Sequence, residues 1–277
     1  MSTAIKKPGF FGRSYTALIM FFLYAPILIL IVFSFNSTRS RTIWTGFTFD
    51  WYRSLITDSS IMNAFYTTLV IAFISAIVAT IAGTFAAVGF YNMQSRWRTP
   101  LMHVNNIPMM NADIATGVSL SLLFISLGTV LRFNLGFGTL LLAHITFNIP
   151  YVVLSIMPKL RQLDNNLVDA ACDLGCTWIQ AFWKVIVPEI MPGIINGLII
   201  AFTLSIDDFV ISYFTAGGNV MTLPMQIFAM TRRRISPEIN ALSTILFLTV
   251  LVLLIVINIR EARQDEKQKK STKVLGR

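Results

Sequence analysis

The sequence predicts an all-α membrane protein with six transmembrane helices. The chain has 277 residues, of which 55% are hydrophobic and only 13% are charged, whereas about a quarter of the residues in a soluble domain are charged. Its mean hydropathy is +0.69. Apolar runs of about 20 residues, the length that crosses the hydrocarbon core of a bilayer, recur along the whole chain.

The six predicted spans follow these apolar runs in order. The first run comes after Lys6, Lys7 and Arg13, as in a signal peptide, but it is too long for a cleaved apolar region of about 7–15 residues. It therefore predicts an uncleaved helix. Polar residues, among them Asn111, interrupt the first half of the third run. The predicted spans are 14–35, 63–90, 101–127, 137–157, 191–214 and 241–259.

The distribution of lysine and arginine predicts the orientation of these spans. Of the 22 basic residues, fifteen fall in the segments on one side, including residues 1–13 and the tail 260–277, and seven fall on the other. Basic residues collect on the cytoplasmic side of membrane proteins. Both termini are therefore predicted to be cytoplasmic, together with the inner loop 158–190.

The two long outer loops carry their own signals. Trp44, Trp51 and Tyr52 in loop 36–62 suit the membrane–water interface. In loop 215–240, Ser236-Pro237-Glu238 predicts the start of the last helix, since serine caps a helix and proline suits its first position.

Several kinds of site and protein class are not supported by the sequence. Cys172 and Cys176 lie far in sequence from His103 and His144, which leaves too few ligands for a metal site. No basic groove with interleaved aromatic residues predicts nucleic-acid binding. The chain has no phosphate-binding Gly-x4-Gly-Lys-Ser/Thr pattern, so any ATP would have to be bound by a partner. No cluster of nucleophiles or acid–base residues predicts an enzyme.

The inner loop contains the most specific pattern in the chain, at residues 164–188. Asp169-Ala170-Ala171 is followed after three residues by Gly175 and after nine more by Val185-x-Val187-Pro188. This pattern resembles the EAA loop of permease subunits of ABC importers, with aspartate in place of glutamate and valine in place of isoleucine and leucine. The alanines permit close approach, Gly175 permits a left-handed turn that ends a helix, and Pro188 starts or kinks the next segment.

Further segments resemble the spermidine/putrescine permeases, in particular the second permease subunit. They are Ser34–Ser37, Ala143–Phe147, Phe202–Phe209, Thr222–Pro224 and Ser236–Leu242. The resemblance implies a type-I ABC importer permease fold, with a core of five helices over residues 63–259 after a first helix and outer loop over residues 14–62. It also implies a cytoplasmic coupling helix, a location in the bacterial inner membrane and the import of polyamines.

The same resemblance implies a set of partners. These are a dimer of ATPase subunits that binds ATP and magnesium, a sister permease that completes a heterodimer, an extracytoplasmic polyamine-binding protein, and membrane lipid. The chain itself is expected to bind no cofactor. Another cargo, such as thiamine, sulfate or an iron complex, remains an alternative. A secondary carrier fits less well, because it is usually longer and built from two inverted repeats.

Carboxylates within the predicted spans are candidates for the substrate path, because a charged side chain in a membrane is costly. On a continuous fifth helix, Ser205, Asp208 and Ser212 would share one polar stripe, with Asp207 about 100° away. Asp208 is therefore predicted to face the path and Asp207 a neighbouring helix or subunit. Phe209 and Tyr213 are predicted to supply aromatic walls for the methylene groups of a polyamine.

Other polar residues complete the set of candidates. In the third span, Asn106, Asp113 and Thr116 would form a second stripe; relatives often have proline before this acid, whereas Ala112 stands here. Glu238 lies near the outer mouth, where it either attracts cations or suits a helix dipole. His144 is predicted to be packed or hydrogen-bonded. Three consecutive arginines on the outer side are predicted to dock an acidic surface of the binding protein: Arg232, Arg233 and Arg234.

Overall fold

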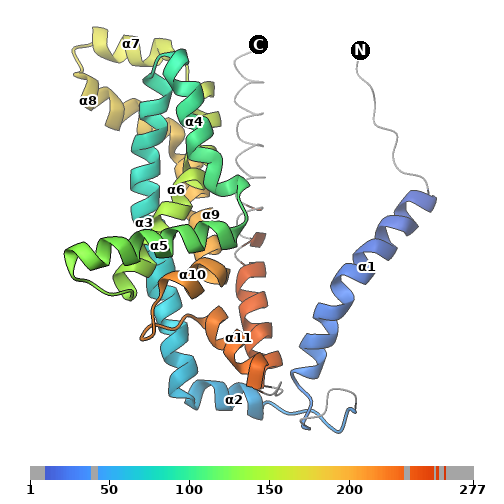
Figure 1. Cartoon of the computed structure of the whole chain (residues 1–277). Helices are drawn as coiled ribbons and strands as arrows, with labels where there is room; N and C mark the ends of the chain where they lie inside the picture. The colour runs from blue at the N-terminus through green and yellow to red at the C-terminus, as the bar shows by residue number, and fades with distance from the viewer. Residues whose placement is uncertain (1–9, 39–42, 234–237, 253, 256–258, 260–277) are drawn as a thin grey trace. The chain divides into compact units, whose positions relative to one another are not determined.

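The computed structural model describes residues 10–38, 43–233, 238–252, 254, 255 and 259, and this part of the chain is predominantly helical (Figure 1). It divides into two compact units, which are described separately. The first comprises Met1–Ser59 and Ala229–Leu248, and the second comprises Ser60–Phe228 and Thr249–Arg277.

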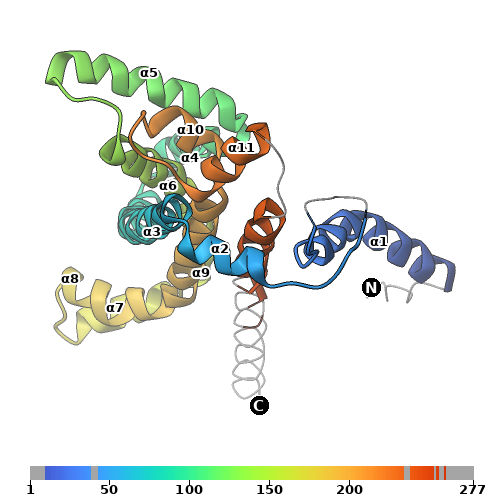
Figure 2. The same ribbon diagram turned by 90° about the horizontal axis from the view of Figure 1, so that it is seen from below.

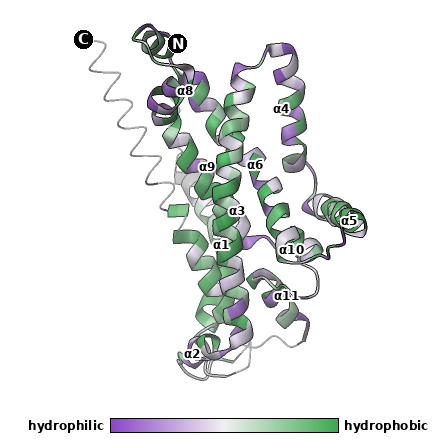
Figure 3. Cartoon of the chain, turned by 90° about the vertical axis from the view of Figure 1, so that its left-hand side faces the viewer, coloured by the Kyte–Doolittle hydropathy of each residue, from purple (hydrophilic) through white to green (hydrophobic). Residues whose placement is uncertain are grey.

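Five helical stretches in the described part are long and apolar enough to cross a membrane. They are Ser14–Phe33, Ser59–Asn92, Asp113–Leu131, Phe137–Gln162 and Trp178–Asp207. The predicted sixth span is described as the shorter apolar helix Glu238–Val252, with Leu254, Ile255 and Ile259 also helical. Hydrophobic residues predominate along α1 and α3 (Figure 3). The predicted tail, 260–277, and the capping residues Ser236 and Pro237 lie outside the described residues.

The first unit contains α1 (Phe10–Phe33) and an outer loop that is more ordered than its sequence indicates. The loop includes a helix, α2 (Asp50–Thr57). The buried Asn36 anchors it: its side chain accepts from the backbone N–H of Thr45 at 3.1 Å, and its backbone carbonyl accepts from the indole of Trp51 at 2.7 Å. The loop is thus a folded element and not a bare connection.

The second unit is built around α3 (Ser59–Asn92), α6 (Phe137–Gln162) and α9 (Val187–Asp207). Small residues let these helices approach closely. A Cβ at Gly83 of α3 would lie 2.7 Å from Val152 Cγ1 of α6, and a Cβ at Gly197 of α9 would lie 3.3 Å from the Val152 Cα. Side chains from all three helices form the main buried cluster, which includes Ala87, Val152, Ile156 and Ile190.

Two of the predicted spans are broken. The third, 101–127, is divided at Asn111 and Ala112 into α4 (Ser95–Met110) and α5 (Asp113–Leu131). Figure 1 shows α5 running across the direction of α3. The fifth, 191–214, begins earlier than predicted and is divided at Asp208 into α9 and α10 (Val210–Thr215). The prediction that each is a single continuous helix is therefore wrong.

Shorter helices complete the second unit. The inner loop forms α7 (Asn165–Asp173) and α8 (Trp178–Ala181), which leads through a π-helix, η1 (Phe182–Ile186), directly into α9. A further helix, α11 (Leu223–Arg233), lies where the sequence predicts only a loop. The backbone N–H of Leu223 donates to Thr68 Oγ1 at 2.7 Å, which ties the start of α11 to α3.

Candidate functional site

The inner segment 164–188 has the helix–turn–helix form that its sequence predicts. Asp164 caps α7, because its carboxylate accepts from the backbone N–H of Asn166 at 3.0 Å. Gly175 has a φ of +87°, and the backbone N–H of Cys176 donates to the Ala171 carbonyl at 3.0 Å. Thr177 then caps α8. The helix end is thus closed by local hydrogen bonds, and the left-handed turn predicted at Gly175 is confirmed.

Apolar and small residues of this segment are exposed. Leu174 is 88% exposed at the end of α7. Asp169 and Ala170 are exposed, and Ala171 is partly so. Pro188 is the second residue of α9, directly after the π-helix η1. The geometry is that of a short helix that packs on the core through Val168 and leaves Asp169 and Ala170 exposed.

Replacement of Gly175 by alanine should loosen this turn. A left-handed residue with a Cβ costs about 1–2 kcal/mol, so the amides at the end of α7 should exchange with solvent roughly 5–30 times faster. Hydrogen–deuterium exchange on the full chain in detergent measures this. Gly175→Asn is the matched control and should have a smaller effect, because asparagine tolerates this conformation better. Equal exchange in all three proteins would contradict the prediction.

The break between α9 and α10 is held together by Asp208. Asp208 has an extended backbone, with φ −65° and ψ 122°. Its carboxylate accepts from the backbone N–H of Ser212 at 2.8 Å and of Ile211 at 3.3 Å, and so caps α10. His144 of α6 places Nε2 3.6 Å from the same carboxylate and 3.0 Å from Ser212 Oγ. His144 is buried and hydrogen-bonded, as predicted.

A second group of buried polar side chains lies on the α9 side of this break. The Asn148 amide of α6 donates to Ser205 Oγ at 2.8 Å, and Ser75 Oγ of α3 lies 3.1 Å from the same hydroxyl. All three residues are buried. We call these two groups together the polar hub: Ser75, His144, Asn148, Ser205, Asp208 and Ser212. The hub joins α3, α6, α9 and α10.

The two adjacent carboxylates differ in exposure. The Asp208 side chain is only 9% exposed, whereas Asp207, the last residue of α9, is exposed. The helical angle used to orient them does not apply, because the helix ends between them. Which of the two lines a path remains a prediction, but Asp208 is engaged in holding the backbone and Asp207 is open to a ligand.

The break between α4 and α5 places a third carboxylate at a helix start. Asp113 is the first residue of α5 and is exposed, a position that suits the positive end of a helix dipole. Asn106 lies on α4 and Thr116 on α5, so the predicted stripe on one helix is wrong. The break forms although Ala112, not proline, precedes the acid.

Aromatic side chains from two helices gather beside the α9–α10 break. Phe209 and Tyr213, the two residues predicted to form aromatic walls, have ring centroids 5.5 Å apart. Phe228 of α11 joins them, at 4.5 Å from Phe209 and 6.4 Å from Tyr213. Phe228 is not among the predicted site residues, because the sequence predicts a loop where α11 lies. The signal of a helix start was Thr222 followed by Pro224.

Close packing fixes α10 beneath α5. A Cβ at Gly117 of α5 would lie 3.1 Å from Phe214 and 3.5 Å from the Ile211 Cα, so a larger residue would not fit without a shift. Figure 2 shows α10 between α5 and α6. The start of α5, with Asp113, and the α9–α10 break therefore belong to one packed layer.

The remaining predicted residues belong to the predicted outer loop 215–240. Glu238 is the first described residue of the last helix and is partly exposed. Arg232 is exposed in the last turn of α11, and Arg233 ends that helix. Arg234 lies outside the described residues. Within the described part, no three histidine, cysteine, aspartate or glutamate residues are grouped so that they could hold a metal ion.

The chain is similar in sequence to known membrane transport proteins. A family described as "Binding-protein-dependent transport system inner membrane component" matches residues 79–270. The putrescine transport system permease protein PotI of Escherichia coli K12 is 41% identical over 228 residues, which cover 81% of each chain. The spermidine/putrescine transport system permease protein PotC of Haemophilus influenzae is 36% identical over 247 residues, 89% of this chain and 95% of that protein.

Solved structures share the fold at much lower sequence identity. A bacterial ABC transporter involved in the import of the acidic polysaccharide alginate aligns with a TM-score of 0.67 at 16% identity, over 90% of this chain and 95% of the other. The MetNI methionine ABC transporter, in an inward-facing conformation, aligns with a TM-score of 0.57 at 18% identity, over 74% and 98%. These similarities concern the fold alone.

Proposed function

Because the chain belongs to the binding-protein-dependent transport system inner membrane component family, we propose that it is a permease subunit of an ATP-driven importer of polyamines. The observation that carries this proposal is the 36–41% identity to putrescine and spermidine/putrescine permeases over 81–89% of the chain. The chain forms part of the translocation path and performs no chemical step of its own.

The open carboxylates and the aromatic cluster support a cationic cargo. A polyamine carries ammonium groups separated by methylene segments, so its path needs acidic groups for the charges and apolar or aromatic walls for the methylenes. Asp207 and Asp113 offer exposed carboxylates at two helix ends. Phe209 and Tyr213, which follow Asp207 closely in the sequence, provide aromatic rings for the methylene groups. Asp208 supports this surface from behind by holding the start of α10.

The helix–turn–helix of residues 164–188 is the proposed contact with the ATPase subunits. Leu174, just after α7, is an exposed apolar residue that a partner could bury. Asp169, Ala170 and Ala171 lie on α7 and belong to the same proposed contact. ATP and magnesium are bound by the ATPase pair. When that pair closes, α7 transmits the movement to the spans, which switch between inward-facing and outward-facing states.

Two further partners complete the proposed transporter. The first span, Ser14–Phe33, is long and apolar enough to cross a membrane, and its proposed neighbours there are lipid and a sister permease. Arg232 and Arg233 are the described members of the arginine run proposed to dock the extracytoplasmic binding protein. Glu238 lies on the same predicted outer side, where it would attract cations.

Uptake of radiolabelled putrescine and spermidine tests the cargo. Cells that lack this chain should lose energised uptake of at least one polyamine and regain it when the wild-type chain is supplied. Unlabelled polyamines should compete, and unlabelled thiamine should not. Uptake that is the same with and without the chain, or that thiamine suppresses, would remove the polyamine assignment while leaving the family membership intact.

A further inference from the structure

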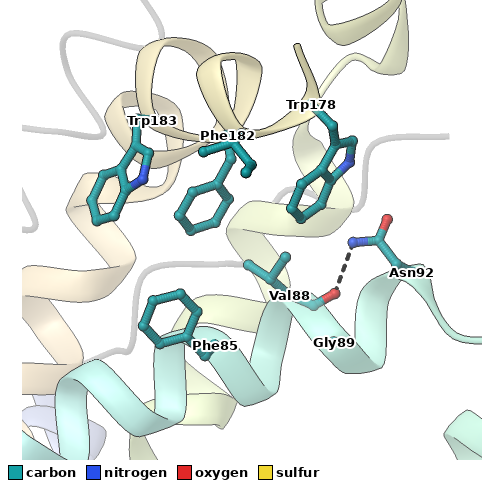
Figure 4. A pocket seen from close by; sticks show the side chains of 8 residues that line it. Phe85, Val88, Gly89, Asn92, Trp178, Phe182 and Trp183 are labelled. Carbon is teal, nitrogen blue, oxygen red and sulfur yellow. Dashed lines mark hydrogen bonds between the residues drawn. The ribbon is translucent and has the colours of Figure 1, made fainter.

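An aromatic groove of about 680 Å³ lies between the end of α3 and the start of the α8–α9 helix (Figure 4). We propose that this groove binds one acyl chain of an anionic phospholipid, with the headgroup held by the basic residues beside it. The proposal depends on the chain spanning a membrane and not on the identity of its cargo. The residues that line the groove are Phe85, Val88, Gly89, Asn92, Trp178, Ile179, Phe182 and Trp183.

Aromatic side chains from α3, α8 and η1 meet at the groove. Phe182 is stacked against Phe85 of α3, with centroids 6.0 Å apart, and against Trp178, with centroids 5.9 Å apart. Trp183 meets Phe182 edge-on at 5.1 Å. Phe182 and Trp183 are consecutive residues of η1, and both line the groove. Such single-turn π-helices are frequent at functional sites.

The groove is open and almost wholly apolar. Trp178, Ile179 and Trp183 are 56%, 66% and 59% exposed. A Cβ at Gly89 would meet no atom within 4 Å, so the floor of the groove is empty. The amide nitrogen of Asn92, the one polar side-chain group in the lining besides the tryptophan indoles, already donates to the Val88 carbonyl at 3.0 Å (Figure 4). This lining suits a hydrocarbon chain and provides little for a polar ligand.

The position of the groove along the helices and the nearby charge favour an anionic lipid. Both walls lie at the ends of helical stretches that are long and apolar enough to cross a membrane, Ser59–Asn92 and Trp178–Asp207. Arg96 and Arg98 follow α3 within a few residues. Lys184 is the basic residue of η1 and is exposed beside Trp183. The distribution of basic residues predicts that the groove lies on the cytoplasmic side of the membrane. Anionic lipids attract lysine and arginine on that side, and tryptophan prefers the level of the lipid headgroups.

Photocrosslinking of the assembled transporter identifies the occupant directly. A photoreactive benzoylphenylalanine replaces Ile179 at the groove, or Ile81, which is 55% exposed on α3 and does not line it. The membranes contain phosphatidylethanolamine and phosphatidylglycerol, and adducts are identified by mass spectrometry. We expect a phospholipid adduct at Ile179 in which phosphatidylglycerol is enriched about fivefold over the adduct at Ile81, the effect of one basic residue at an anionic surface.

Two variants separate the acyl chain from the headgroup. Gly89→Leu should fill the floor and reduce the Ile179 adduct severalfold without changing the Ile81 adduct, and Gly138→Leu, at an open glycine of α6, is the matched control. Lys184→Gln should remove the enrichment and leave the adduct.

Two results would overturn the proposal. One is an adduct to a peptide of the ATPase or the sister permease, and the other is the same lipid composition at Ile179 and Ile81. The comparison in the otherwise unaltered chain decides even if Gly89→Leu fails to assemble.

Discussion

Asp207→Asn is expected to lower polyamine uptake by about 10- to 100-fold while the amount of chain in the membrane stays unchanged. A hydrogen bond to a charged group contributes about 1.5–3 kcal/mol, and the amide would lose the charge that meets an ammonium group. Asp207 is exposed at the end of α9, so we expect its replacement by asparagine to leave the fold intact. Initial uptake rates in whole cells, divided by the chain detected in membranes, measure the effect.

Asp208→Ala is the matched control for this prediction. It removes the acceptor for the backbone N–H groups of Ile211 and Ser212 and leaves His144 without its carboxylate. We expect it to reduce the amount of folded chain and its melting temperature in detergent, with uptake falling in proportion. If Asp208→Ala instead left the amount and melting temperature unchanged and abolished uptake, then Asp208 would be the carboxylate of the path, as the helical stripe predicts.

Gly217→Ala is expected to destabilise the chain by about 2–5 kcal/mol. Gly217 has a φ of +68°, which costs a residue with a Cβ about 1–2 kcal/mol. Its Cβ would also lie 2.5 Å from the carbonyl oxygen of Leu135, which is backbone and cannot move as a side chain can. Such overpacking typically costs a further 1–3 kcal/mol. The melting temperature of the purified chain in detergent should fall by several degrees.

Gly218→Ala provides the control at the next position. A Cβ at Gly218 meets nothing within 4 Å, and the residue has no positive φ. Its replacement should leave the melting temperature unchanged within error. A similar decrease for both variants would mean that the loop as a whole rejects side chains, and the specific contact between Gly217 and Leu135 would lose its support.

Hydropathy predicted where the spans lie but not where they break. The number of apolar residues reflects the free energy of transfer into the bilayer. This free energy depends little on whether the backbone is one continuous helix or two shorter ones. Neither break contains glycine or proline at its centre: Ala112 is extended before Asp113, and Asp208 is extended after α9. The signal of a break was the presence of polar residues within an apolar run. Such residues are costly in a membrane, and irregular backbone is tolerated there only where protein covers it.

The candidate site was predicted in part. The pattern around Gly175 specified its turn because only a residue without a Cβ readily adopts a positive φ. The sequence also identified Asp208 and His144 individually. It could not pair them, because their contact joins α6 to the α9–α10 break and depends on tertiary packing. Ser75 and Asn148 gave no signal, since serine and asparagine within an apolar run are common in membrane helices.

The polar hub has a consequence for the order in which the chain enters the membrane. α10 has six residues and cannot cross a bilayer alone, so the backbone groups at its start need partners inside the protein. Asp208 accepts from the backbone N–H groups of Ile211 and Ser212. The hub side chains on other helices, which contact the hydroxyls of Ser205 and Ser212, are all synthesised before Asp208: Ser75, His144 and Asn148. Synthesis from the amino terminus therefore delivers a prepared polar surface to the broken helix as it leaves the ribosome.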